Sequence, residues 1–153
     1  MSKIVRTITN ILYVFIIGFG FYVIIHGHLT PGGGFQGGAV VASAFALLAV
    51  AYGRKKIVNL LNKEHLSVAE VSGLLAFICL AFLGLGTVFF FNFLAVGRSI
   101  PIFSNTPAGI NPGDLNTAGI IPLMNIAVGV EVLSALGVII LTMFLGFKEG
   151  KEK

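Results

Sequence analysis

The sequence predicts an all-α integral membrane protein with four transmembrane helices. Of its 153 residues, 56% are hydrophobic and only 10% are charged, and the mean hydropathy is +0.99. A soluble domain carries about 25% charged residues, because its surface must stay wetted. Four apolar segments are each near or above the ~20 residues that cross a bilayer. Basic residues cluster at the segment ends, which indicates membrane topology rather than a nucleic-acid partner. We therefore expect a single membrane domain over residues 1–153.

The first predicted span covers about residues 7–25. Lys3 and Arg6 precede an apolar run that continues to Ile25, as in the opening of a signal peptide. The run contains no small-residue cleavage site of the usual kind, and three further apolar segments follow. A retained first helix is therefore the better interpretation.

The second predicted span covers about residues 34–52. Small residues recur along one face of this segment, at Ala39, Ala42, Ser43 and Ala46. Small side chains at helical spacing let a neighbouring helix approach closely, which is the usual contact between helices in membranes. We expect this span to pack tightly against another helix.

The third predicted span covers residues 68–96 and is longer than a perpendicular helix needs, so it should tilt or extend past the headgroups. Ser67 and Glu70 form a capping-box pattern, with Ser67 at the N-cap and Glu70 three positions later. We favour this capping role for Glu70 over a place in an ion path. The lone Cys79 allows no disulfide within the chain and fits a buried structural thiol.

The fourth predicted span covers residues 122–147, and Pro122 suits the first turn of this helix. An N-terminus on the cytoplasmic side places nine basic residues inside and only Arg98 outside. This asymmetry predicts an N-in, C-in multi-pass protein of the plasma membrane, with residues 97–117 on the outer face. The nine residues are Lys3, Arg6, Arg54, Lys55, Lys56, Lys63, Lys148, Lys151 and Lys153.

A glycine-rich segment joins the first two spans. Gly32, Gly34 and Gly37 satisfy the G-x-G-x-x-G pattern, but a membrane helix precedes them instead of a strand, which argues against dinucleotide binding. Three interpretations remain: a tight turn, a close-packing surface, or a re-entrant loop that lines a polar cavity. The residues concerned are His26, His28, Pro31, Gly32, Gly33, Gly34 and Phe35.

His26 and His28 lie two positions apart, so both imidazoles reach one metal ion only in an extended backbone. Two imidazoles without a third ligand make a weak site. We expect interfacial histidines that bond to loop carbonyls, with a modulatory proton role open to them because histidine titrates near neutral pH. No metal and no cofactor is expected.

Glu131 is the one ionisable residue at the predicted midplane. It follows Pro122 by nine residues, which is on the order of 14 Å along a helix. An acidic residue at a helix centre costs roughly 2.5–3.5 kcal/mol. Ser134 shares its helix face, and Asn125 adds a polar group nearer the outer end. Two roles stay open: a neutral carboxyl that joins helices by hydrogen bonds, or a proton or cation relay that faces another subunit.

Two runs carry a resemblance to a known family. The run Gly27–Gly38 reads G-H-L-T-P-G-G-G-F-Q-G-G, and the run Ile121–Gly129 reads I-P-L-M-N-I-A-V-G. Together with the four-helix layout, these runs resemble the MnhB/MrpB family, small membrane subunits of multisubunit Na⁺/H⁺ antiporters of the Mrp type. Related subunits occur in archaeal membrane-bound hydrogenases and sulfane reductases that contain an Mrp-like module.

The resemblance implies a non-catalytic subunit of a large complex that exchanges Na⁺ for H⁺. Its expected partners are the other membrane subunits of such a complex, and it would help to form the ion path. A structural adaptor between neighbouring subunits is the alternative. The sequence itself contains no nucleophile–base pair and no phosphate loop in a credible context, so we expect no enzyme site.

Overall fold

Four long helices make up most of this computed structural model, which describes residues 2–84, 88–96, 105–107, 109 and 112–146. The four are long and apolar enough to cross a membrane, and the described residues form no strand beyond an isolated bridge. The predicted all-α class with four spanning helices is therefore confirmed. The long helices are α1 (Lys3–Ile25), α2 (Gly34–Tyr52), α4 (Lys63–Phe82) and α6 (Ile121–Gly146), and the short ones are α3 (Arg54–Leu60), α5 (Phe93–Val96) and a 3₁₀ helix (Pro112–Asn116).

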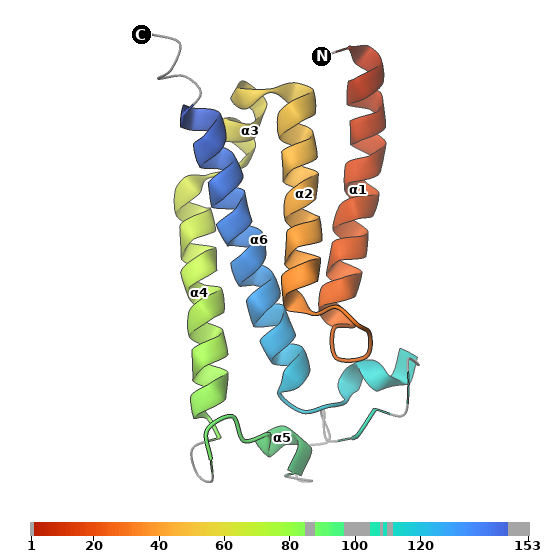
Figure 1. Cartoon of the computed structure of the whole chain (residues 1–153), viewed down its shortest axis with the longest axis vertical. Coiled ribbons are helices and arrows are strands. Elements are labelled where there is room, and N and C mark those ends of the chain that lie inside the picture. Colours follow the sequence, from red (N-terminus) through yellow and green to blue (C-terminus); the bar gives the residue numbers. More distant parts are fainter. Residues whose placement is uncertain (1, 85–87, 97–104, 108, 110–111, 147–153) are drawn as a thin grey trace.

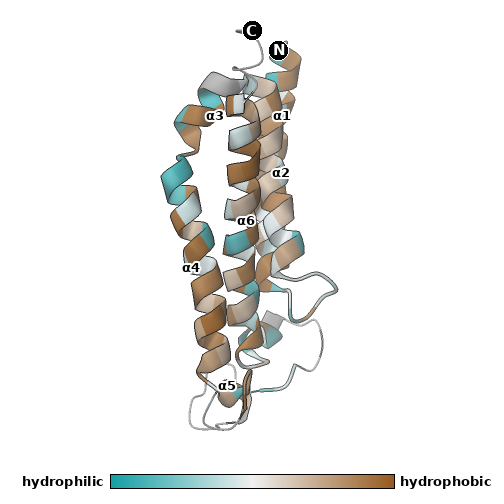
Figure 2. Cartoon of the chain, turned by 60° about the vertical axis from the view of Figure 1, so that its left-hand side comes forward, coloured by the Kyte–Doolittle hydropathy of each residue, from teal (hydrophilic) through white to brown (hydrophobic). Residues whose placement is uncertain are grey.

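The long helices stand in a row one helix thick (Figure 1). Helix α2 packs between α1 and α6, and α4 packs on the far side of α6. Half of the α2 span is buried, compared with 17% of α1 and 11% of α4. The rest of the row is apolar and open, as at Phe15 and Val68, which are 70% and 68% exposed (Figure 2). Both broad faces of the row are therefore available to lipid or to other proteins.

Helix α4 corrects the predicted start of the third span. It begins at Lys63, because the Asn62 side chain accepts a hydrogen bond of 2.9 Å from the Glu64 N–H and so caps the helix before Ser67 is reached. Ser67 therefore lies inside the helix, and the predicted capping box of Ser67 and Glu70 is wrong. Nothing between the two candidate caps breaks a helix, so the earlier cap sets the boundary.

The same helix also ends earlier than predicted, at Phe82 instead of Val96. Phe91 lies close to Gly84, where an added Cβ would lie 2.7 Å from the Phe91 amide nitrogen. Phe90, with a positive φ of 64°, donates its N–H back to the Ala81 carbonyl at 3.1 Å. The sequence stays apolar beyond Phe82, so hydropathy did not reveal where the helix ends.

Helix α3 was not predicted and closes the end of the row that carries the N-terminus (Figure 1). Gly53, with φ +75°, turns the chain out of α2 in a conformation that favours glycine. Ile57 is then fully buried against Leu48 and Leu141, in a small core beneath α3. This packing holds the short helix across the ends of α2 and α6.

The described basic residues gather at the same end of the row. They lie in the first turns of α1 and α4 and in α3. Membrane proteins commonly gather Lys and Arg on one side of the bilayer in this way. Assigning this end to the cytoplasm stays a prediction. The residues are Lys3, Arg6, Arg54, Lys55, Lys56 and Lys63, while Arg98, Lys148, Lys151 and Lys153 lie outside the described part of the chain.

Candidate functional site

Glu131 lies near the middle of α6 and is half-buried where α4 crosses that helix. Gly73 of α4 makes this crossing close. A Cβ added to Gly73 would lie 2.8 Å from the Ala127 carbonyl oxygen, 2.9 Å from the Glu131 nitrogen and 3.1 Å from the Glu131 Cβ. The missing side chain on α4 therefore brings its backbone onto the turn of α6 that carries the carboxyl group.

The Glu131 carboxyl has no hydrogen-bond or ion-pair partner among the described residues. A carboxylate in an apolar helix is stable only when it is protonated, hydrated or paired with a positive charge. The described part of the chain supplies no such positive charge beside this carboxyl.

Of its predicted companions, Ser134 lies one turn further along α6 and is 2% exposed. Asn125 lies about 9 Å along the axis in the other direction and belongs to a different environment. Its amide packs on the turn between α1 and α2, with Oδ1 3.1 Å from a Cβ added to Gly33 and Nδ2 2.8 Å from one added to Gly27. The structure therefore separates Asn125 from Glu131.

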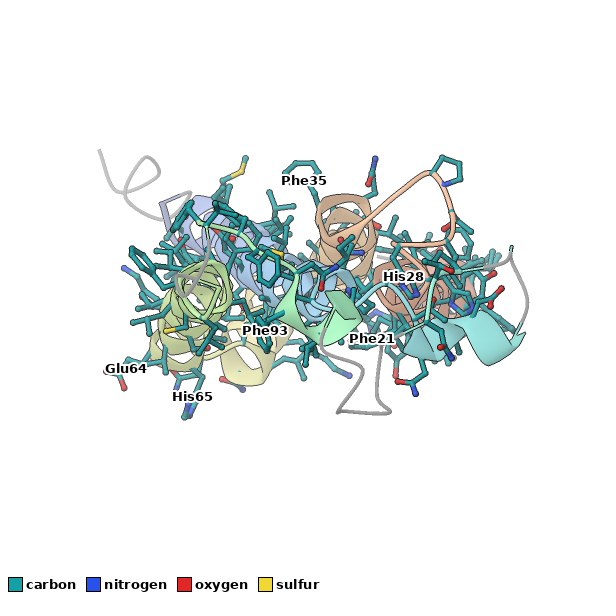
Figure 3. All side chains as sticks on the ribbon, turned by 90° about the horizontal axis from the view of Figure 1, so that it is seen from below. Phe21, His28, Phe35, Glu64, His65 and Phe93 are labelled. Carbon is teal, nitrogen blue, oxygen red and sulfur yellow. The ribbon has the colours of Figure 1, made fainter. Side chains whose placement is uncertain are left out.

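The glycine-rich segment forms the turn between α1 and α2 and the first turn of α2. Gly32 has φ +130°, which favours glycine, and the exposed Pro31 precedes it. The Gln36 side chain accepts a hydrogen bond of 2.6 Å from the Gly33 N–H and fixes the first turn of α2. Phe35 is 64% exposed and projects from α2 away from the row (Figure 3).

The helical glycines of this segment form two close contacts. Gly37 faces α1, where an added Cβ would lie 2.7 Å from the Gly20 carbonyl oxygen. Gly34 and Gly38 face α6, where added Cβ atoms would each lie 2.8 Å from a backbone atom of Gly129. The two runs that carry the family resemblance therefore pack directly against each other.

The two histidines bond to different carbonyls. His26 Nδ1 lies 3.1 Å from the Tyr22 carbonyl oxygen, and its ring stacks on that of Tyr22 at 4.0 Å. His28 Nε2 lies 3.1 Å from the Asp114 carbonyl oxygen and donates to it, which ties the turn to the 3₁₀ helix (Figure 3). Within the described ranges, no three His, Cys, Asp or Glu side chains are placed to hold a metal ion.

Sequence reasoning missed two positioning residues. Gly73 is a lone glycine inside an apolar helix, a pattern that often marks close approach of another backbone. Asn92 holds the start of α6: its side chain donates to the Ala118 carbonyl and accepts from the Ile120 N–H, both at 3.0 Å. An asparagine within the apolar residues 88–96 was the available signal.

A single layer of four helices that are long and apolar enough to cross a bilayer defines a multi-pass membrane protein. Residues 4–138 match the family described as a domain related to the MnhB subunit of Na⁺/H⁺ antiporter. The chain belongs to this family.

The curated relatives include a subunit of an antiporter. A Na⁺/H⁺ antiporter subunit of Bacillus subtilis is 40% identical over 73 residues, covering 48% of this chain and 51% of the relative. An uncharacterized protein of Methanocaldococcus jannaschii is 36% identical over 137 residues, covering 88% of this chain and 49% of that protein. The chain thus spans about half the length of the curated relatives that it matches.

A solved structure extends the comparison to a redox complex. A chain of the membrane-bound sulfane sulfur reductase, an archaeal respiratory membrane complex, matches with a TM-score of 0.70 and 31% identity. The match covers 94% of this chain and 58% of that one. The relatives thus come from an antiporter and from a respiratory membrane complex.

Proposed function

We propose that this chain is a non-catalytic membrane subunit of a multisubunit cation/proton antiporter module in the plasma membrane, where it helps to form the path of Na⁺ and H⁺. The observation that carries the proposal is the unpartnered, half-buried Glu131 carboxyl at the α4–α6 crossing. The names of its relatives support an antiporter-type complex as its setting.

The chemistry of the carboxyl suits exchange. The group is neutral when it carries a proton, and its charge is balanced when it binds Na⁺ through its oxygen atoms. The bare carboxylate is the costly state at this depth, by roughly 2.5–3.5 kcal/mol. One cation therefore leaves most readily when another takes its place, or when a basic group of a neighbouring subunit pairs with the carboxylate.

The proposed orientation is N-in and C-in. The described cations at the ends of α1 and α4 and in α3 support it, because cytoplasmic ends carry the excess of Lys and Arg. The turn between α1 and α2 and the start of α6 then open toward the outer face.

The test is Glu131→Gln in the assembled complex, measured as Na⁺-dependent proton exchange in inverted vesicles. Glutamine keeps the size of the side chain and loses the titratable group, so we expect exchange to be lost while the subunits still copurify. Glu64→Gln is the matched control, since Glu64 is exposed in the first turn of α4 (Figure 3). Unchanged exchange in the assembled Glu131→Gln complex would refute the relay.

The alternative is a structural adaptor, favoured by the open broad faces of the row. Gly34 packs within the chain, so Gly34→Leu would report on the fold of this subunit. The exposed Phe35 gives a cleaner test. An adaptor predicts that Phe35→Ala weakens copurification with neighbours and that Glu131→Gln leaves transport intact.

A further inference from the structure

A basic cleft opens at the end of the row that carries the N-terminus. It has a volume of about 530 Å³ and lies between the first turns of α1, the end of α2 and α3. Its lining residues are Arg6, Tyr52, Lys56, Asn59 and Leu60. It lies at the opposite end of the row from the glycine turn and plays no part in the proposed transport site.

Tyr52 contacts both cations of this cleft and one residue of α1. Its hydroxyl donates a hydrogen bond of 2.5 Å to Asn10 Oδ1, which fixes the ring of an α2 residue against α1. Lys56 Nζ lies 4.2 Å from the ring centroid, and Arg6 Cζ lies 5.6 Å from it. The buried Ile57 anchors α3, so the neighbouring Lys56 is held in place by the fold.

The two cations have no counter-charge among the described residues. No acidic side chain in that part of the chain forms an ion pair with Arg6 or Lys56. The attraction of each cation to the ring is weak at an exposed site and leaves its charge in place. The cleft therefore presents two positive charges beside the amide of Asn59, and its complement is an anion with several oxygen acceptors. Arginine binds the oxygens of a phosphate with two parallel hydrogen bonds.

The position of the cleft favours a membrane lipid as the source of that phosphate. It lies where α1 begins and α2 ends, which is the depth of the lipid headgroups. Basic pockets between helices at this depth bind anionic lipids. Apolar side chains continue from it: Leu60 in its wall is 55% exposed, and Val14, one helical turn beyond Asn10 on α1, is 56% exposed. We propose that the cleft binds the headgroup phosphate of an anionic phospholipid, whose acyl chains lie along the open face of α1.

The test is native mass spectrometry of the full chain in detergent, titrated with phosphatidylglycerol or phosphatidylcholine. We expect phosphatidylglycerol to bind at a concentration at least about tenfold lower, since each basic residue near the surface adds several-fold to the affinity for an anionic lipid. The double variant Arg6→Gln/Lys56→Gln should lose this preference. Lys63→Gln, which removes a cation at the same end outside the cleft, should keep it.

Two further measurements separate loss of charge from misfolding, and lipid binding from phosphate binding. The charge-preserving pair Arg6→Lys/Lys56→Arg should retain most of the preference for phosphatidylglycerol, which separates the loss of charge from a failure to fold. Inorganic phosphate at the same concentration should not displace the bound lipid. The proposal is overturned by an unchanged preference in the glutamine double variant, by equal losses in both double variants, or by displacement with inorganic phosphate.

Discussion

Replacing Gly38 by alanine tests the glycine contact between α2 and α6 with a single added methyl group. The new Cβ would lie 2.8 Å from the Gly129 carbonyl oxygen, 3.0 Å from the Val132 Cβ and 3.1 Å from the Leu133 nitrogen. Two of these atoms are backbone, so no side-chain rotation relieves the contact. Helix α6 must instead withdraw until the distance rises from 2.8 Å to the 3.4 Å of ordinary contact.

The expected energy combines two opposing effects. Overpacking of a well-packed contact costs about 1–3 kcal/mol. Alanine in place of glycine in a helix gains up to about 1 kcal/mol. Gly18→Ala on α1 isolates the second effect, because an added Cβ there meets nothing within 4 Å. The difference between the two variants therefore reports the clash alone, and we expect Gly38→Ala to be less stable than Gly18→Ala by about 1–3 kcal/mol.

The assay is reversible unfolding of the purified chain in mixed micelles by titration with SDS, followed by helical circular dichroism. Each variant is compared with the unmodified chain at one protein concentration. Equal unfolding free energies for Gly38→Ala and Gly18→Ala would show that α2 and α6 do not approach as closely as the backbone distances require. The proposed role of the glycine-rich segment as a helix contact would then be wrong.

Two further substitutions test how the ends of α4 and α6 are held. Asn62→Ala should lower the unfolding free energy by about 1 kcal/mol because it removes the N-cap of α4, whereas Ser67→Ala should change it little. A larger loss of stability in Ser67→Ala than in Asn62→Ala would instead place the start of the helix at the capping box. Asn92→Ala should cost about 1–3 kcal/mol, because it leaves the N–H of the buried Ile120 without its acceptor. Hydrogen exchange should quicken at the Ile120 amide and stay unchanged at the Ile16 amide in α1, and equal protection at Ile120 in both proteins would contradict this role for Asn92.

Hydropathy predicted the four spans because lipid-facing and buried residues are both apolar, so a spanning helix is visible without knowledge of its neighbours. It failed after Phe82, where the helix ends although the phenylalanines that follow are as apolar as the helix before them. It also missed α3, whose basic residues fit a loop equally well and whose helix is held by burial of Ile57 and Leu61. Local pattern does not report such tertiary contacts.

The candidate site was predicted in part. The depth of Glu131 follows from counting along one helix. Its closeness to Gly73 joins two helices far apart in sequence, and one sequence offers no measure of that pairing. Asn125 was grouped with Glu131 because both are polar and both lie in the same apolar segment. In the structure, Asn125 packs against the glycine turn instead, because residues without a side chain leave room there for its amide.

The single-file arrangement of the helices has a geometric consequence for Glu131. A layer one helix thick is only about 10–12 Å across. A side chain at the contact between two of its helices is therefore a short rotation away from either broad face. In the proposed complex, such a subunit would form a thin partition between two environments, and Glu131 would lie within reach of both.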